Sequence, residues 1–98
     1  MATFISTIKF TEQGIQNIKE TGKRANAFKA AAKKLGAKVN DIYWTLGAFD
    51  GAILFEAPDD ETATALMLGL SSLGNVQTRT ARAFDAKDMD GILSKMNG

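Results

Sequence analysis

The chain of 98 residues contains no cysteine and no histidine. Without cysteine it has no disulfide, no thiolate nucleophile and no zinc–cysteine site. Without histidine it lacks the commonest general base, the commonest metal ligand and the usual protein ligand of haem. Most familiar enzyme mechanisms are therefore excluded, and we expect neither a cofactor nor a metal site.

Long apolar runs are also missing. No stretch approaches the roughly 20 apolar residues that span a bilayer. The N-terminal MATFISTIKF has no basic leader, and Ser6, Thr7 and Lys9 interrupt its apolar residues. We therefore expect a cytoplasmic protein with no signal peptide and no membrane partner.

The hydrophobic content of 45% is typical of a globular protein. A chain of this length suits one domain, residues 1–98, and buries a limited fraction of its surface. A second subunit would therefore help to stabilise it.

Alternating apolar and polar side chains predict four strands. In the second of them, VNDIYWTL, the alternation places Ile42, Trp44 and Leu46 on one face and Tyr43 on the other. The third follows the turn GAFDG and is apolar on both faces, as in a sheet that is covered on both sides. The predicted strands are residues 3–10, 39–46, 52–57 and 76–84.

Helical spacing predicts the segments between and after the strands. Thr11 is expected to cap a short helix that turns Ile15 and Ile18 inward and is interrupted at Gly22. A second helix runs from residue 24 to a left-handed turn at Gly36. A third begins at the acids 59–61 and runs through 73, and the tail 85–98 is helical with Asp85 as its cap.

The resulting order is β-α-β-β-α-β plus a C-terminal helix. It predicts an α+β protein with the ferredoxin-like split βαβ unit, in which two helices cover one face of a four-stranded antiparallel sheet. Residues 1–84 would form the core, and the apolar stripe of the tail would dock on its own subunit or on a neighbour. That stripe consists of Met89, Ile92, Leu93 and Met96.

The strand patterns predict a second apolar face of the sheet that no helix covers. Exposed apolar areas of this size mark interfaces. We therefore expect the chain to be its own partner, in a homodimer or higher oligomer whose sheets pack face to face.

The segments TLGAFDGAILFEAPDDETA and LSSLGNVQTRTARAF resemble the GYD family of small uncharacterised proteins. The resemblance extends from the first strand, through KRANAFKAAAKKLG, to Phe84. The Gly-x-Tyr-Asp turn of the family reads Gly47-Ala48-Phe49-Asp50 here, which puts any role of a phenolic hydroxyl in proton transfer in doubt. The resemblance implies a ferredoxin-like fold and a dimeric α/β-barrel assembly, and it implies no reaction.

The turn GAFDG has two interpretations. In the first, Gly47 and Gly51 permit positive φ, Asp50 binds the local backbone, and Phe49 packs against the sheet edge or a partner. In the second, Asp50 is a base or ligand at the mouth of a pocket. A lone carboxylate beside glycine favours the turn.

The acids Asp59, Asp60 and Glu61 also have two interpretations. In the first turn of a helix, acids complement the positive end of the helix and supply a capping oxygen. Adjacent residues on a helix splay apart and seldom converge on one ion, so the pattern favours a helix start over a metal site.

Tyr43 and Trp44 lie on opposite faces of their strand, and so do Arg79 and Arg82. The two aromatic residues either belong to a core or line a ligand cavity. An arginine at a packed surface needs an anion. A structural ion pair with an acid such as Asp50 or Glu56, within one chain or across a dimer, is favoured over an anionic ligand. The candidates for a ligand cavity are Tyr43, Trp44, Phe49 and Arg79.

These observations favour a homo-oligomeric protein that binds a small apolar or anionic molecule or serves a structural role. The alternative is a cofactor-independent oxygenase or isomerase, by analogy with dimeric α/β-barrel folds, in which Asp50 is the only base. The helical lysines are interpreted as a solvated face rather than a nucleic-acid interface, because no aromatic platform is interleaved with them. They are Lys23, Lys29, Lys33 and Lys34.

Overall fold

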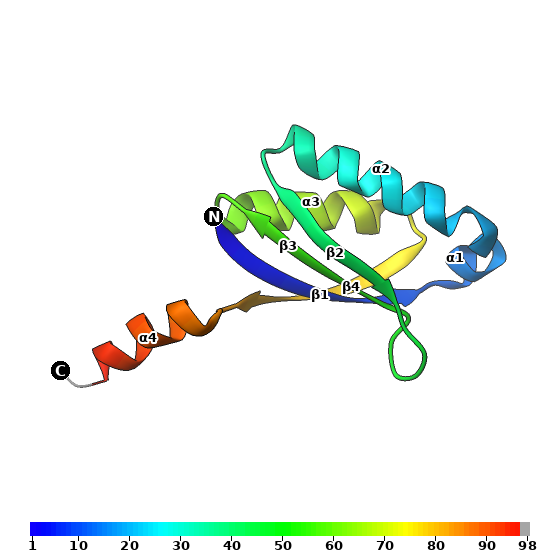
Figure 1. Cartoon of the computed structure of the whole chain (residues 1–98). Helices are drawn as coiled ribbons and strands as arrows, with labels where there is room; N and C mark the ends of the chain where they lie inside the picture. The colour runs from blue at the N-terminus through cyan, green and yellow to red at the C-terminus, as the bar shows by residue number, and fades with distance from the viewer. Residues whose placement is uncertain (97–98) are drawn as a thin grey trace.

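The computed structural model describes residues 1–96, which form a four-stranded antiparallel sheet with helices on one face (Figure 1). The strand order is β2-β3-β1-β4, so the predicted α+β, ferredoxin-like fold is confirmed. The last two residues of the predicted tail, 97–98, lie outside the described residues. The strands are β1 (Ala2–Phe10), β2 (Lys38–Trp44), β3 (Gly51–Ala57) and β4 (Val76–Ala83). The helices are α1 (Glu12–Gln16), the 3₁₀ helix η1 (Ile18–Glu20), α2 (Thr21–Lys34), α3 (Asp60–Ser72) and α4 (Ala86–Lys95).

The core lies between the sheet and the pair α2 and α3. β1 pairs with β3 on one side and with β4 on the other, so its side chains lie at the centre of the sheet. Phe4 of β1 stacks on Phe55 of β3 with ring centroids 5.3 Å apart. Ser6 is fully buried and accepts a hydrogen bond from the Thr80 hydroxyl at 2.9 Å. The buried helix residues that cover these strands are Phe28, Ala32, Ala63, Leu66 and Met67.

A bulge in β2 alters the predicted alternation. Val39 pairs with Phe55 and Asp41 pairs with Leu54, so Asn40 is an extra residue without a partner. The bulge brings Val39 to the helix side, where it packs against the core. The strand then ends at Trp44, and Leu46 is fully exposed in the loop at 45–50, so its predicted place in the strand was wrong.

The first helical segment also differs from the prediction. Thr11 caps α1, because its hydroxyl accepts a hydrogen bond from the Gly14 amide at 3.1 Å. The break in the helix falls at Asn17 and η1, while Gly22 lies inside α2. Ile15 and Ile18 are exposed rather than buried, because α1 presents Gly14 to the fold instead.

The tail helix α4 extends away from the rest of the chain (Figure 1). It begins at a capping box in which Asp85 and Asp88 each accept a hydrogen bond from the backbone amide of the other. None of its side chains is buried, so it docks on no groove formed by residues 1–96. The Cα radius of gyration of 14.9 Å accordingly exceeds the roughly 13 Å of a compact chain of this length. No helix within residues 1–96 is long and apolar enough to cross a bilayer.

We predict that Gly14→Ala destabilises the fold. A Cβ at residue 14 would lie 2.0 Å from the backbone oxygen of Asn75, so α1 and the turn after α3 would have to move apart. The expected loss is about 1–3 kcal/mol in the free energy of unfolding, measured by chemical denaturation. Gly22→Ala is the matched control, because its Cβ meets nothing within 4 Å and alanine favours a helix by up to about 1 kcal/mol. Equal effects of the two changes would contradict the prediction.

Candidate functional site

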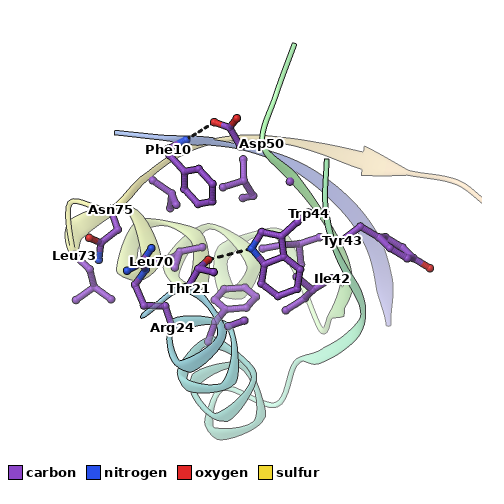
Figure 2. A pocket seen from close by; sticks show the side chains of 16 residues that line it. Phe10, Thr21, Arg24, Ile42, Tyr43, Trp44, Asp50, Leu70, Leu73 and Asn75 are labelled. Carbon is purple, nitrogen blue, oxygen red and sulfur yellow. Dashed lines mark hydrogen bonds between the residues drawn. The ribbon is translucent and has the colours of Figure 1, made fainter. Parts of the chain in front are cut away.

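The predicted site residues divide between the two faces of the sheet. Tyr43 and Trp44 face opposite sides of β2, as the alternation predicts. Trp44 and Asp50 border a pocket on the helix side, from which the Tyr43 ring points away (Figure 2). Phe49 and Arg79 instead line a hollow that they share with Thr7 and Lys9.

The pocket on the helix side, which we call the Trp44 pocket, has a volume of about 70 Å³. The Trp44 indole N–H donates to the Thr21 hydroxyl at 3.0 Å, which ties the end of β2 to the start of α2 (Figure 2). The indole is 52% exposed, so one side of it faces solvent. The walls of the pocket are mostly apolar and include Phe10, Phe28, Ile42, Ile53, Leu70 and Val76.

Asp50 joins the turn to the end of β1. Its carboxylate oxygen Oδ2 accepts a hydrogen bond from the Phe10 amide at 2.8 Å, and its own amide donates to the Ile8 carbonyl at 2.8 Å. We predicted that the Asp50 side chain binds the backbone of its own turn. That prediction was wrong, because the donor is the amide of Phe10, which precedes Asp50 by 40 residues. Asp50 thus borders the pocket at one end, with its carboxylate already bound to the backbone (Figure 2).

The two glycines of the turn serve different purposes. Gly47 has φ of 125°, so the prediction of positive φ is confirmed there. Gly51 has no positive φ, and the prediction for it was wrong. A Cβ at residue 51 would lie 2.9 Å from the Tyr43 carbonyl oxygen, so glycine allows β2 and β3 to approach each other closely.

We predict that Asp50→Ala lowers the free energy of unfolding by about 1.5–3 kcal/mol, because it removes an ionised acceptor from the partly buried Phe10 amide. Asp50→Asn keeps an acceptor oxygen, so its free energy of unfolding is expected to fall by less than that of Asp50→Ala. Urea denaturation measures both changes. Asp90→Ala, on the unburied helix α4, is the control and should stay within about 0.5 kcal/mol of the wild type. A loss at Asp50 no larger than that at Asp90 would remove Asp50 from this structural role.

The face of the sheet opposite the helices, which we call the open face, carries three rows of side chains that pair across all four strands. The rows are Tyr43, Ala52, Thr7 and Arg79; Asp41, Leu54, Ile5 and Ala81; and Lys38, Glu56, Thr3 and Ala83. Ile5 is 41% exposed and Tyr43 is 56% exposed. The open face is therefore apolar at its centre and charged at both edge strands.

Phe49 and Arg79 meet at one end of the open face. Together with Thr7, Lys9 and Gln77 they line a hollow of about 530 Å³, which we call the Arg79 hollow. The Lys9 ammonium donates to the Ala48 carbonyl at 3.4 Å and holds the loop over the hollow. Two cations beside an aromatic ring suit a small anion with an apolar part.

The two arginines of β4 occupy different surroundings. Arg82 lies over the Phe4 ring at 5.6 Å and the Phe84 ring at 4.7 Å, and it donates to the Thr3 carbonyl at 3.1 Å. Arg79 lies on the opposite face. Among residues 1–96 neither arginine forms an ion pair, so the predicted pair with Asp50 or Glu56 does not form within one chain.

The acids at 59–61 begin α3, as the helix-start interpretation predicts. The Asp59 carboxylate accepts a hydrogen bond from the Thr62 amide at 2.7 Å. Hydrogen bonding to the side chain and to the backbone amide of Thr62 lowers the pKa of Asp59 below its ordinary value of 3.8. Asp60 and Glu61 lie in the first turn of the same helix.

We predict that Asp59 makes stability depend on pH under acidic conditions. Because its pKa is lower in the folded state, its contribution is complete above the unfolded value of 3.8 and is lost as the pH falls through the folded value. Asp59→Asn keeps a capping oxygen that does not titrate. The stability difference between wild type and Asp59→Asn, measured by thermal unfolding, should therefore shrink as the pH falls below 3.8. Parallel pH profiles would contradict this assignment.

The sequence interpretation missed Arg24 and Thr21, which both line the Trp44 pocket. The interpretation of the basic helix considered four lysines and did not single out Arg24. The spacing contained a signal, because Arg24 precedes the buried Phe28 by four residues and so shares its side of α2.

Comparisons with known proteins found a family and two solved structures to which this chain is similar. A family model described as the GYD domain matches residues 4–93. The crystal structure of TTHA0845 from Thermus thermophilus is similar with a TM-score of 0.56 and 27% identity, covering 88% of this chain and 96% of that one. The crystal structure of MtbAldR is similar with a TM-score of 0.58, covering 86% of this chain and 52% of that one.

At 15% identity, the likeness to MtbAldR shows the fold alone, and this chain matches about half the length of that protein. The comparison with curated proteins found no match.

Proposed function

The chain belongs to the GYD domain family, and we propose that it forms a homodimer through the open face of its sheet and binds a small anionic molecule at the edge of that interface. One observation carries the proposal. Within residues 1–96 no helix or loop covers the centre of the open face, where Ile5 is 41% exposed and Tyr43 is 56% exposed.

Burial of apolar area drives the association. Ile5 and Leu54 are direct partners on neighbouring strands, and Ala52 and Ala81 extend the apolar surface toward both sides. Each square ångström that a second copy removes from water contributes about 25 cal/mol. A second copy of the same face is the partner that a two-fold axis provides without any other protein.

The charges of the open face are arranged to complement themselves. Asp41 and Lys38 of β2 and Glu56 of β3 give one half of the face a net charge of −1, whereas Lys9 of β1 and Arg79 of β4 give the other half a net charge of +2. A two-fold axis that runs along the strands between β1 and β3 lays β4 of one copy against β2 of the other. Arg79 then meets Tyr43 and Asp41 of the partner subunit, which supplies the anion that its own chain does not.

The Arg79 hollow gives the dimer a binding function. Its volume of about 530 Å³ falls within the roughly 300–1,000 Å³ of small-molecule sites. A second sheet would cover it and exclude water, and this strengthens the attraction between Lys9 or Arg79 and an anion. Phe49 offers an apolar wall, so an anion with an aromatic or aliphatic part fits best.

We predict that native mass spectrometry finds the wild type at twice the chain mass of 10.5 kDa and Ile5→Glu at the chain mass. The reason is that Ile5→Glu buries a charge in the centre of the interface. Ile15→Glu, on the exposed surface of α1, is the matched control and should leave the dimer intact.

Arg79→Asp and Asp41→Arg should each weaken the dimer by at least about tenfold in Kd, and the double variant should recover most of the loss. A wild type that is monomeric at micromolar concentration would overturn the proposal.

A further inference from the structure

Arg24 carries a charge that no acid of its own chain neutralises within the described residues. It is half-buried beside the Trp44 pocket, where its Nη1 donates to the Asn17 carbonyl at 2.8 Å and its Nη2 to the Gly14 carbonyl at 3.5 Å. Both acceptors are neutral, and no carboxylate within residues 1–96 forms an ion pair with it. A guanidinium has five N–H donors, so donors remain for an anionic partner.

The pocket beside Arg24 is apolar inside and polar at its ends. Phe28, Ile42 and Leu70 line its interior, and the Trp44 indole closes one side (Figure 2). Arg24 and Asn75 lie toward one end, whereas Asp50 lies at the other and is engaged by the Phe10 amide (Figure 2). An anion at the Arg24 end is therefore separated from the one carboxylate of the pocket.

We propose that the Trp44 pocket is a second binding site, specific for a short aliphatic carboxylate. The carboxylate pairs with the N–H donors of Arg24 that the Asn17 and Gly14 carbonyls leave free. The hydrocarbon end enters between Trp44 and Phe28. The Thr21 hydroxyl accepts its bond from Trp44, so its own hydrogen is free to turn toward the same carboxylate.

The volume of the pocket limits the size of the ligand. A protein cavity of about 150 Å³ holds benzene, so the 70 Å³ found here has room for about three carbon atoms. The pocket therefore encloses about three carbons beyond the carboxyl group of the ligand, and isobutyrate is the carboxylate that matches this size. A long fatty acid or a phosphorylated sugar would not fit inside.

The site is independent of the proposed dimer. The Trp44 pocket lies between the sheet and the helices, whereas the open face and the Arg79 hollow lie on the other side of the sheet. A chain that stays monomeric would keep the Trp44 pocket intact. Failure of one proposal can therefore be told apart from failure of the other.

We predict that isobutyrate changes the fluorescence of Trp44, the only tryptophan of the chain, in a saturable manner. The uncharged isobutyramide has nearly the same shape and cannot neutralise Arg24. Half-saturation by isobutyrate should therefore need a concentration at least about tenfold lower than half-saturation by isobutyramide, at constant ionic strength set with sodium chloride. This comparison uses only the wild-type protein.

Variants locate the binding. Arg24→Gln should remove the preference for the carboxylate, and Ala25→Leu should abolish binding by filling the pocket while leaving Arg24 in place. Lys33→Gln, on the exposed surface of the same helix, and Ile5→Glu, on the other face of the sheet, should bind isobutyrate as the wild type does. Circular dichroism confirms that each variant is folded. Equal responses to isobutyrate and isobutyramide, no saturable response to isobutyrate below about 0.1 M, or full binding by Ala25→Leu would each overturn the proposal.

Discussion

A sheet has two faces, and the helices of this chain bury only one of them. α2 and α3 cover the side of Phe4 and Phe55, where the core is closed and its buried serine is satisfied. On the other side the centre of the sheet stays open to solvent, because α4 extends away from it rather than across it. The two faces therefore differ: helices cover one, and the other is exposed to solvent. The assembly that we propose and the place of each candidate residue both depend on this difference.

The structure around the sites is held by close contacts between backbones that are distant in sequence. Asp50 ties the loop before β3 to the last amide of β1, and Gly51 lets β2 approach its neighbour. Just beyond the end of β1, Gly14 lies against the backbone of Asn75. Asp50, Gly51 and Asn75 line the Trp44 pocket, so these contacts position one wall of it.

The candidates for chemistry do not form one active site. Tyr43 and Arg79 lie on the open face, while Trp44 and Asp50 border the pocket beneath the helices. An oxygenase or isomerase that used all four on one substrate would need them on the same side of the sheet. Because Asp50 is already engaged by Phe10, the arrangement favours binding at two separate places over proton transfer at one.

Local patterns in the sequence determined the order of the elements, the placement of Trp44 and Tyr43 on opposite faces of their strand, and the caps at Thr11 and Asp59. Alternation, helical spacing and capping act over a few residues, so they can be interpreted without the fold. The tertiary structure decided the rest. The bulge at Asn40 turned Val39 toward the core, Gly14 took the buried place expected for two isoleucines, and Arg24 of the basic helix came to line a pocket. Each of these depends on segments that meet only when the chain has folded, and no local pattern records where they meet.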